Sequence, residues 1–114
     1  MKTACIQQIA RDVTEYKEAW KDIIKLIDRA AAKEPDLIVL PESAYPAYFL
    51  GYDQKKCEES LENIDEVINE LKNKARYYEI YIAAGIVLKE KDKKYNGGIL
   101  INRKGEKLCI VQLI

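Results

Sequence analysis

The chain has 114 residues, which is enough for one small domain. Its 19 basic and 19 acidic side chains give a formal net charge of zero, so we expect no nucleic-acid or anionic-membrane partner, because phosphate binding needs a basic excess. The chain contains no histidine, which excludes Ser-His-Asp and Cys-His catalysis as well as histidine metal sites.

The cysteines indicate a cytoplasmic protein. Cys5, Cys57 and Cys109 are odd in number and widely spaced, which is typical of reduced thiols rather than of a disulfide framework. There is no Cys-x-x-Cys motif, so we expect no zinc site. No apolar run approaches the length of a membrane span, and the first residues have no signal-peptide pattern.

The first half of the chain predicts a strand–helix–strand unit. Residues 3–9 form the first expected strand, and Thr14 is a candidate N-cap for the helix that follows. One helix face is apolar, because apolar residues recur at steps of three and four positions: Tyr16, Ala19, Trp20, Ile23, Ile27, Ala30 and Ala31. Residues 37–40 are an unbroken apolar run, as expected of a strand covered on both faces.

Glu42 is the candidate functional residue of this unit. Pro41 has no N–H to donate and stops the strand, so Glu42 stands at its carboxyl end, where ligands bind in open α/β sheets. The alternative is an ordinary solvated loop acid, and this stretch alone leaves both interpretations open. On the first interpretation we expect the carboxylate in a concave, partly buried place.

An aromatic loop follows Glu42. Residues 43–57 contain Tyr45, Tyr48, Phe49 and Tyr52, with a turn at Pro46. Such a loop either lines a pocket or packs under a neighbouring element. If it lines a pocket, Tyr48 is the candidate substrate-binding residue.

The second half predicts a helix and three strands. Ser60 is a candidate cap for a helix whose apolar stripe runs to Tyr78, and residues 80–88 form a strand that is apolar on both faces. Two further strands, residues 98–102 and 106–114, are joined by a tight turn. The expected fold is α/β: a mostly parallel sheet with both long helices on one face and a C-terminal hairpin.

Several segments occur together in an order and spacing that resemble a known family. They are Ala4-Cys5-Ile6-Gln7, Asp36-Leu-Ile-Val-Leu-Pro-Glu42, Tyr45-Pro46, Tyr95-Asn96-Gly97 and Lys104-Gly105-Glu106. The chain resembles the N-terminal part of the nitrilase superfamily, the carbon–nitrogen hydrolases. The resemblance implies part of an α-β-β-α sandwich, with residues 1–114 as a single truncated domain.

The resemblance also implies a chemistry. Family members cleave non-peptide C–N bonds in small amides, carbamoyl compounds or nitriles with a Glu, a Lys and a Cys, and they need no metal or cofactor. The Cys thiolate forms a covalent acyl-enzyme, the Glu acts as general base, and the Lys stabilises the developing oxyanion.

Only the glutamate of that site carries over, onto Glu42. Counting from Gly105-Glu106, the family's lysine position falls on Leu113, and its motif is absent. The family's nucleophile is expected beyond Ile114, and Cys5, Cys57 and Cys109 match it in neither place nor context. The resemblance therefore implies an enzyme portion that is inactive by itself.

Two other hypotheses remain. The chain could be a non-catalytic binding or assembly module that keeps the fold, or an enzyme that combines Glu42 with a local lysine and Cys57. The helices are expected on one sheet face, which leaves the other face uncovered, either that of Tyr81, Ala83, Gly85 and Val87 or the opposite one. We therefore expect either a homo-oligomer through the open sheet face or a poorly stable fragment.

Overall fold

The computed structural model describes residues 1–46 and 53–113. Its sheet contains five strands whose spatial order equals their sequence order. They are β1 (Thr3–Cys5), β2 (Leu37–Val39), β3 (Tyr81–Glu90), β4 (Lys93–Ile101) and β5 (Lys107–Leu113). β1, β2 and β3 are parallel, while β4 is antiparallel to both β3 and β5, so four of the five strands run in one direction. The expected mostly parallel sheet with a C-terminal hairpin is confirmed.

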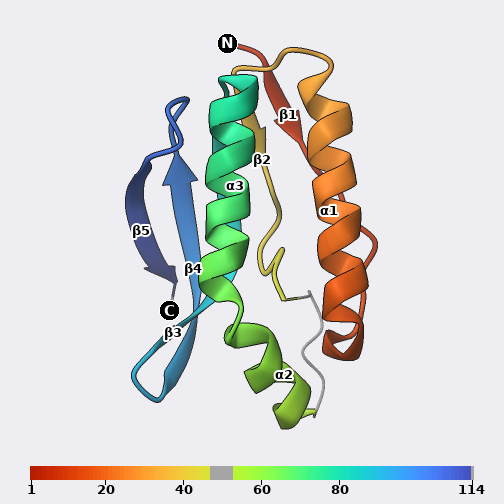
Figure 1. The fold of residues 1–114 in the computed structure, drawn as a ribbon, viewed down its shortest axis with the longest axis vertical. Coiled ribbons are helices and arrows are strands. Elements are labelled where there is room, and N and C mark those ends of the chain that lie inside the picture. The colour runs from red at the N-terminus through yellow and green to blue at the C-terminus, as the bar shows by residue number, and fades with distance from the viewer. Residues whose placement is uncertain (47–52, 114) are drawn as a thin grey trace.

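The helices gather on one face of this sheet. A short 3-10 turn (Val13–Glu15) leads into α1 (Tyr16–Ala31), and α2 (Gln54–Leu61) precedes α3 (Ile64–Tyr78). Figure 1 shows α1 and α3 side by side in front of the strands, running in the same direction. Their apolar stripes meet the strands in a core that contains Ile23, Leu71 and Ile82, each fully buried. The expected placement of both long helices on one face is therefore confirmed.

The helix starts differ from the expected ones. Asp12, not Thr14, caps the first turn, since its carboxylate accepts a hydrogen bond from the Thr14 N–H at 2.9 Å. Ser60 is no cap either, because it lies inside α2, fully buried, and donates its hydroxyl to the Cys57 carbonyl at 2.6 Å. Asp53 caps α2 through the Lys56 N–H. Asp12 and Asp53 stand directly before their helices, where a side-chain oxygen can accept from the amide two or three residues later.

Two strand expectations also change. β1 ends at Cys5 rather than at Ile9, although the Ile6 N–H still donates to the Val39 carbonyl at 2.9 Å. The partner strand leaves the ladder directly afterwards, so the later residues have no strand to pair with. Val87 lies on one of the two strand faces that the sequence allows to be uncovered, but it is buried against Val13, Cys57 and Leu61. Among the described residues, no helix is long and apolar enough to cross a membrane.

Asp28 links α1 to α3. Its Oδ1 accepts hydrogen bonds from Lys74 Nζ at 2.8 Å and from the Tyr78 hydroxyl at 2.7 Å. Burial raises the pKa of Asp28, but the hydrogen bonds from Lys74 and Tyr78 outweigh it, so the pKa is lowered. The hydrogen bond to Asp28, with burial, raises the pKa of Tyr78 to about 12.

Replacement of Tyr78 by phenylalanine should therefore destabilise the fold in a pH-dependent way. Loss of this hydrogen bond should lower the free energy of unfolding by about 1 kcal/mol at pH 7. Because the folded pKa of Tyr78 lies above the ordinary value of 10, the contribution is complete below pH 10 and disappears as the pH rises toward 12. Urea titrations of both proteins from pH 7 to 11 measure it. Tyr77→Phe, at a 79% exposed neighbour, is the control, and an equal loss there would contradict the assignment.

Candidate active site

The candidate site lies where β2 leaves the sheet. The Leu40 N–H donates to the Ala83 carbonyl at 2.8 Å, and the next ladder bond runs from the Ala44 N–H to the Gly85 carbonyl at 2.8 Å. Residues 41–43 therefore stand opposite a single two-residue step of β3 and form a bulge. Pro41 contributes because it has no N–H for the ladder. Ser43 adopts a positive φ of 51°, which turns the chain back toward β3.

Gly85 makes room for this bulge. A Cβ on Gly85 would come within 2.7 Å of both the Glu42 Cα and the Pro41 carbonyl oxygen, so the bulge backbone rests directly on the glycine. The missing Cβ would share the side of β3 that carries Ala83, because side chains alternate along a strand. α1 and α3 pack on the opposite side, against Ile82 and Ala84. The bulge thus lifts Glu42 onto the sheet face opposite α1 and α3.

Asn96 fixes the carboxylate of Glu42. It lies on β4, in register with Val87 of β3, and its Nδ2 donates to Glu42 Oε1 at 3.2 Å. This places the acid at the carboxyl end of the parallel strands, as the sequence predicts. The expectation of a partly buried carboxylate is wrong, however, because Glu42 is exposed. Of the three bulge residues, only Glu42 is exposed, since Pro41 is half-buried and Ser43 is buried.

Two of the positioning residues had no role in the sequence prediction. Asn96 belonged to the Tyr95-Asn96-Gly97 segment of the resemblance, but its partner could not be read from the segment. Gly85 interrupts a strongly apolar strand, and a glycine in such a place indicates either a bulge or the close approach of another backbone. That signal could have pointed to the contact with residues 41–43.

The aromatic loop is described only at its start. Tyr45 is 2% exposed, its ring meets the edges of Trp20 and Tyr16 at centroid distances of 5.5 and 6.2 Å, and its hydroxyl donates to the Ser60 carbonyl at 2.5 Å. Burial raises the pKa of Tyr45. Tyr45 therefore packs beneath the helices and also lines a groove between α1 and α3, so both predicted alternatives apply to it. Tyr48, Phe49 and Tyr52 lie outside the described residues.

The structure separates the thiols from one another. Cys57 is buried in α2 against Val13 and Leu61, while Cys5 and Cys109 are exposed on β1 and β5. Within the described part of the chain, Cys57 makes no contact that joins it to Glu42. The structure therefore offers nothing for the hypothesis of a site built from Glu42, a local lysine and Cys57.

The face that carries Glu42 is apolar and open. Register places one set of side chains there, and apart from Val87, which packs against Cys57 and Leu61 of α2, none of them is buried. This open face consists of Thr3, Cys5, Leu37, Val39, Tyr81, Ala83, Leu100, Cys109 and Val111. Arg103 covers its margin, with its guanidinium 5.5 Å from the Tyr81 ring centre and an ion pair to Asp36 at 2.9 Å. In the described structure, Glu42 therefore borders a surface that a further protein layer could cover.

Solved structures share this fold. A carbon-nitrogen hydrolase from Helicobacter pylori G27 superposes with a TM-score of 0.84 at 18% identity, over 100% of this chain and 39% of its own. An amidase from Nesterenkonia sp. has a TM-score of 0.79 at 22% identity, covering 98% of this chain and 42% of its own. A variant of the Nesterenkonia sp. AN1 amidase (TM-score 0.77, 21% identity, 100% and 43% coverage) carries the acetamide moiety of fluoroacetamide on its active-site cysteine. The chain thus spans less than half the length of these proteins.

Sequence comparison leads to the same group. The apolipoprotein N-acyltransferase of Aquifex aeolicus (strain VF5) is 42% identical over 67 residues, which are 54% of this chain and 15% of that protein. The family model for carbon-nitrogen hydrolases matches residues 2–112. The chain belongs to the carbon-nitrogen hydrolase family.

Proposed function

We propose that the chain is the N-terminal portion of a hydrolase that acts on non-peptide C–N bonds of small amides, carbamoyl compounds or nitriles, with Glu42 as general base. The observation that carries the proposal is the bulge over Gly85, which holds Glu42 at the carboxyl end of the parallel strands and beside the open face. The hydrogen bond from Asn96 orients one carboxylate oxygen and leaves the other free to take a proton.

The proposed chemistry needs two more groups. For an amide, Glu42 removes the proton of a thiol, the thiolate attacks the carbonyl carbon, and the amine leaves with a proton. Water, deprotonated by Glu42, then releases the acid and the thiol. The acetamide adduct on the Nesterenkonia amidase supports a cysteine in this role. Here the lysine position holds Leu113, and the three cysteines do not match the nucleophile, so we propose that this chain is inactive alone. We also propose that it is cytoplasmic.

An ammonia-release assay tests the proposed inactivity. We expect wild type and Glu42→Gln to release equal, background amounts from a panel of small amides and nitriles. The substitution keeps the shape of the side chain and removes its basic oxygen, so it serves as the matched control. Turnover by wild type that Glu42→Gln lacks would overturn the proposed inactivity.

The coding DNA after the codon for Ile114 tests the hydrolase assignment. The assignment expects a lysine motif and then a cysteine in one of the reading frames. In the polypeptide so extended, Glu42→Gln should abolish activity and leave the thermal melt unchanged. An extension without these residues, or an active Glu42→Gln protein, would contradict the assignment.

The second candidate is a non-catalytic assembly module that buries its open face in another copy of the chain. The observation that favours it is the partly exposed apolar surface across the strands, from Leu37 and Val39 to Val111. Single exposed apolar side chains are ordinary on proteins, but a contiguous patch marks an interaction site. Sheet faces of this kind pack well on one another.

A further inference from the structure

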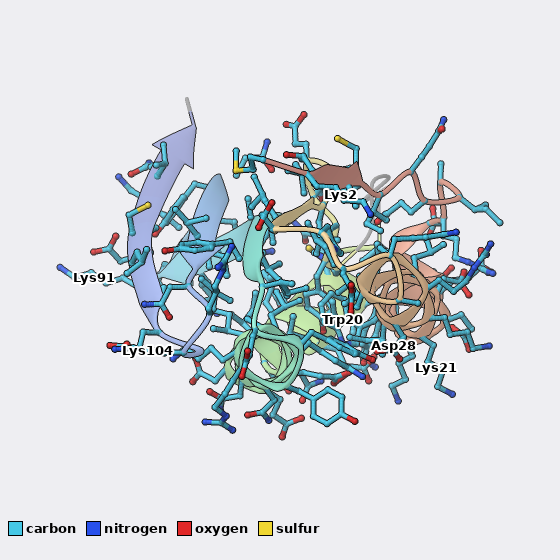
Figure 2. All side chains as sticks on the ribbon, turned by 90° about the horizontal axis from the view of Figure 1, so that it is seen from above. Lys2, Trp20, Lys21, Asp28, Lys91 and Lys104 are labelled. Atoms are coloured by element: carbon cyan, nitrogen blue, oxygen red, sulfur yellow. The ribbon has the colours of Figure 1, made fainter. Side chains whose placement is uncertain are left out.

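A second surface of the molecule, on the helix side of the sheet, has a charge pattern of its own. A groove of about 510 Å³ runs between α1 and α3 on the helical side. Its floor is apolar and includes Tyr16, Trp20, Ile24 and Val67. Figure 2 shows Trp20 between the two helices and Lys21 on the side of α1 that faces away from the sheet. The groove is thus an outward-facing surface of the helix layer, and Tyr45 also lines it.

The two walls of the groove carry opposite charges. Lys17, Lys21 and Lys25 form a lysine row on α1, and Glu66 and Glu70 form a glutamate row on α3. Residues four apart lie on one side of a helix, so each row is a line of like charges that repel one another. Among the described residues, none of the five forms an ion pair, either across the groove or along its helix.

We propose that this groove is a dimer interface for a second copy of the chain. α1 and α3 run in the same direction (Figure 1), so a twofold axis parallel to them places α1 of each copy over α3 of the other. The lysine row of one copy then faces the glutamate row of its partner, twice by symmetry. An axis across the helices would instead place lysine row on lysine row, so the charges select one arrangement.

Charge-reversed variants test the proposed dimer. Lys21→Glu/Lys25→Glu reverses two of the three lysines of one wall, and Glu66→Lys/Glu70→Lys reverses both glutamates of the other. Alone, each should self-associate at least about tenfold more weakly than wild type, because attractive pairs become repulsive at both symmetric contacts. Mixed, they should pair with an affinity within about threefold of wild type, since each reversed wall then meets its complement. Lys17 is left unchanged because its Nζ lies 5.9 Å from the Tyr16 ring centre.

Native mass spectrometry with one variant labelled with ¹⁵N measures homodimers and heterodimers in one sample. Recovery of the heterodimer also shows that both variants fold. Added salt should weaken this dimer, because its selectivity is electrostatic. The proposal would be overturned if both double variants formed homodimers as tightly as wild type. It would also be overturned if the mixture failed to form heterodimers while circular dichroism showed intact helices. A wild-type protein that stays monomeric at every concentration would overturn it equally.

Discussion

Gly85→Ala will lower the free energy of unfolding by about 1–3 kcal/mol, whereas Gly98→Ala will change it by less than about 1 kcal/mol. The two glycines face each other in register on β3 and β4. A Cβ at position 85 would lie 2.7 Å from the backbone of Glu42 and Pro41, and backbone cannot swing aside as the end of a side chain can. At position 98 the nearest atom, the Ala84 carbonyl oxygen, is 3.9 Å away.

The same pair of variants tests whether Gly85 positions Glu42. Urea titration gives the two stability changes, and the Asn96 side-chain amide resonances report on its hydrogen bond to Glu42. We expect these resonances to move in Gly85→Ala and to stay in place in Gly98→Ala. Equal stability of the two variants, with unmoved Asn96 signals, would show that the bulge does not rest on Gly85 as described.

The regular elements of this fold could be predicted because their signals are local. The stripe of α1 and the apolar strand β3 depend on periodicity along a continuous segment, and both lie close to where the sequence places them. The sequence pattern of α2 is weak, so its first half, residues 54–57, falls in the expected aromatic loop and Ser60 and Leu61 fall in the expected next helix. Of its apolar residues, Cys57 and Leu61 are buried only through contact with Val13 and Val87, from distant parts of the chain.

The candidate site was predictable in position but not in environment. Glu42 follows a strand and a proline, so its place at the strand's carboxyl end could be read from neighbouring residues. Its exposure could not, because burial depends on whether another layer covers the bulge. The contacts with Gly85 and Asn96 join residues more than forty positions apart along the chain. A sequence pattern within one segment carries no information on such pairings.

The second large effect concerns the open face, which we expect to drive either self-association or low stability. An apolar patch of about 300 Å² at about 25 cal/mol per Å² is worth several kcal/mol, comparable with the whole stability of a small domain. Val111 is 52% exposed on β5 and lies in register with Gly98, so its side chain belongs to this face. Val111→Glu should therefore weaken association through the sheet. Ile9→Glu, at a 72% exposed residue outside the strands, adds the same charge and should not.

The two proposed interfaces can be separated. They lie on opposite sides of the molecule, so a chain that uses both can form stacks larger than a dimer. Val111→Glu should not affect the dimer that forms through the groove between α1 and α3. Lys21→Glu/Lys25→Glu should not affect the dimer that forms through the sheet. Salt distinguishes them as well, because it screens the charged groove and does not weaken apolar contact.

Light scattering over a range of concentrations, with a thermal melt of the same samples, tests most directly whether this chain is an open layer that needs cover. We predict that the average mass of the wild-type protein rises with concentration, and that Val111→Glu lowers this mass toward that of smaller species. The alternative that the account allows is a broad melt at low temperature. A dilute monomer with a sharp melt, unchanged by Val111→Glu, would contradict the account: the face beside Glu42 would then need no second layer.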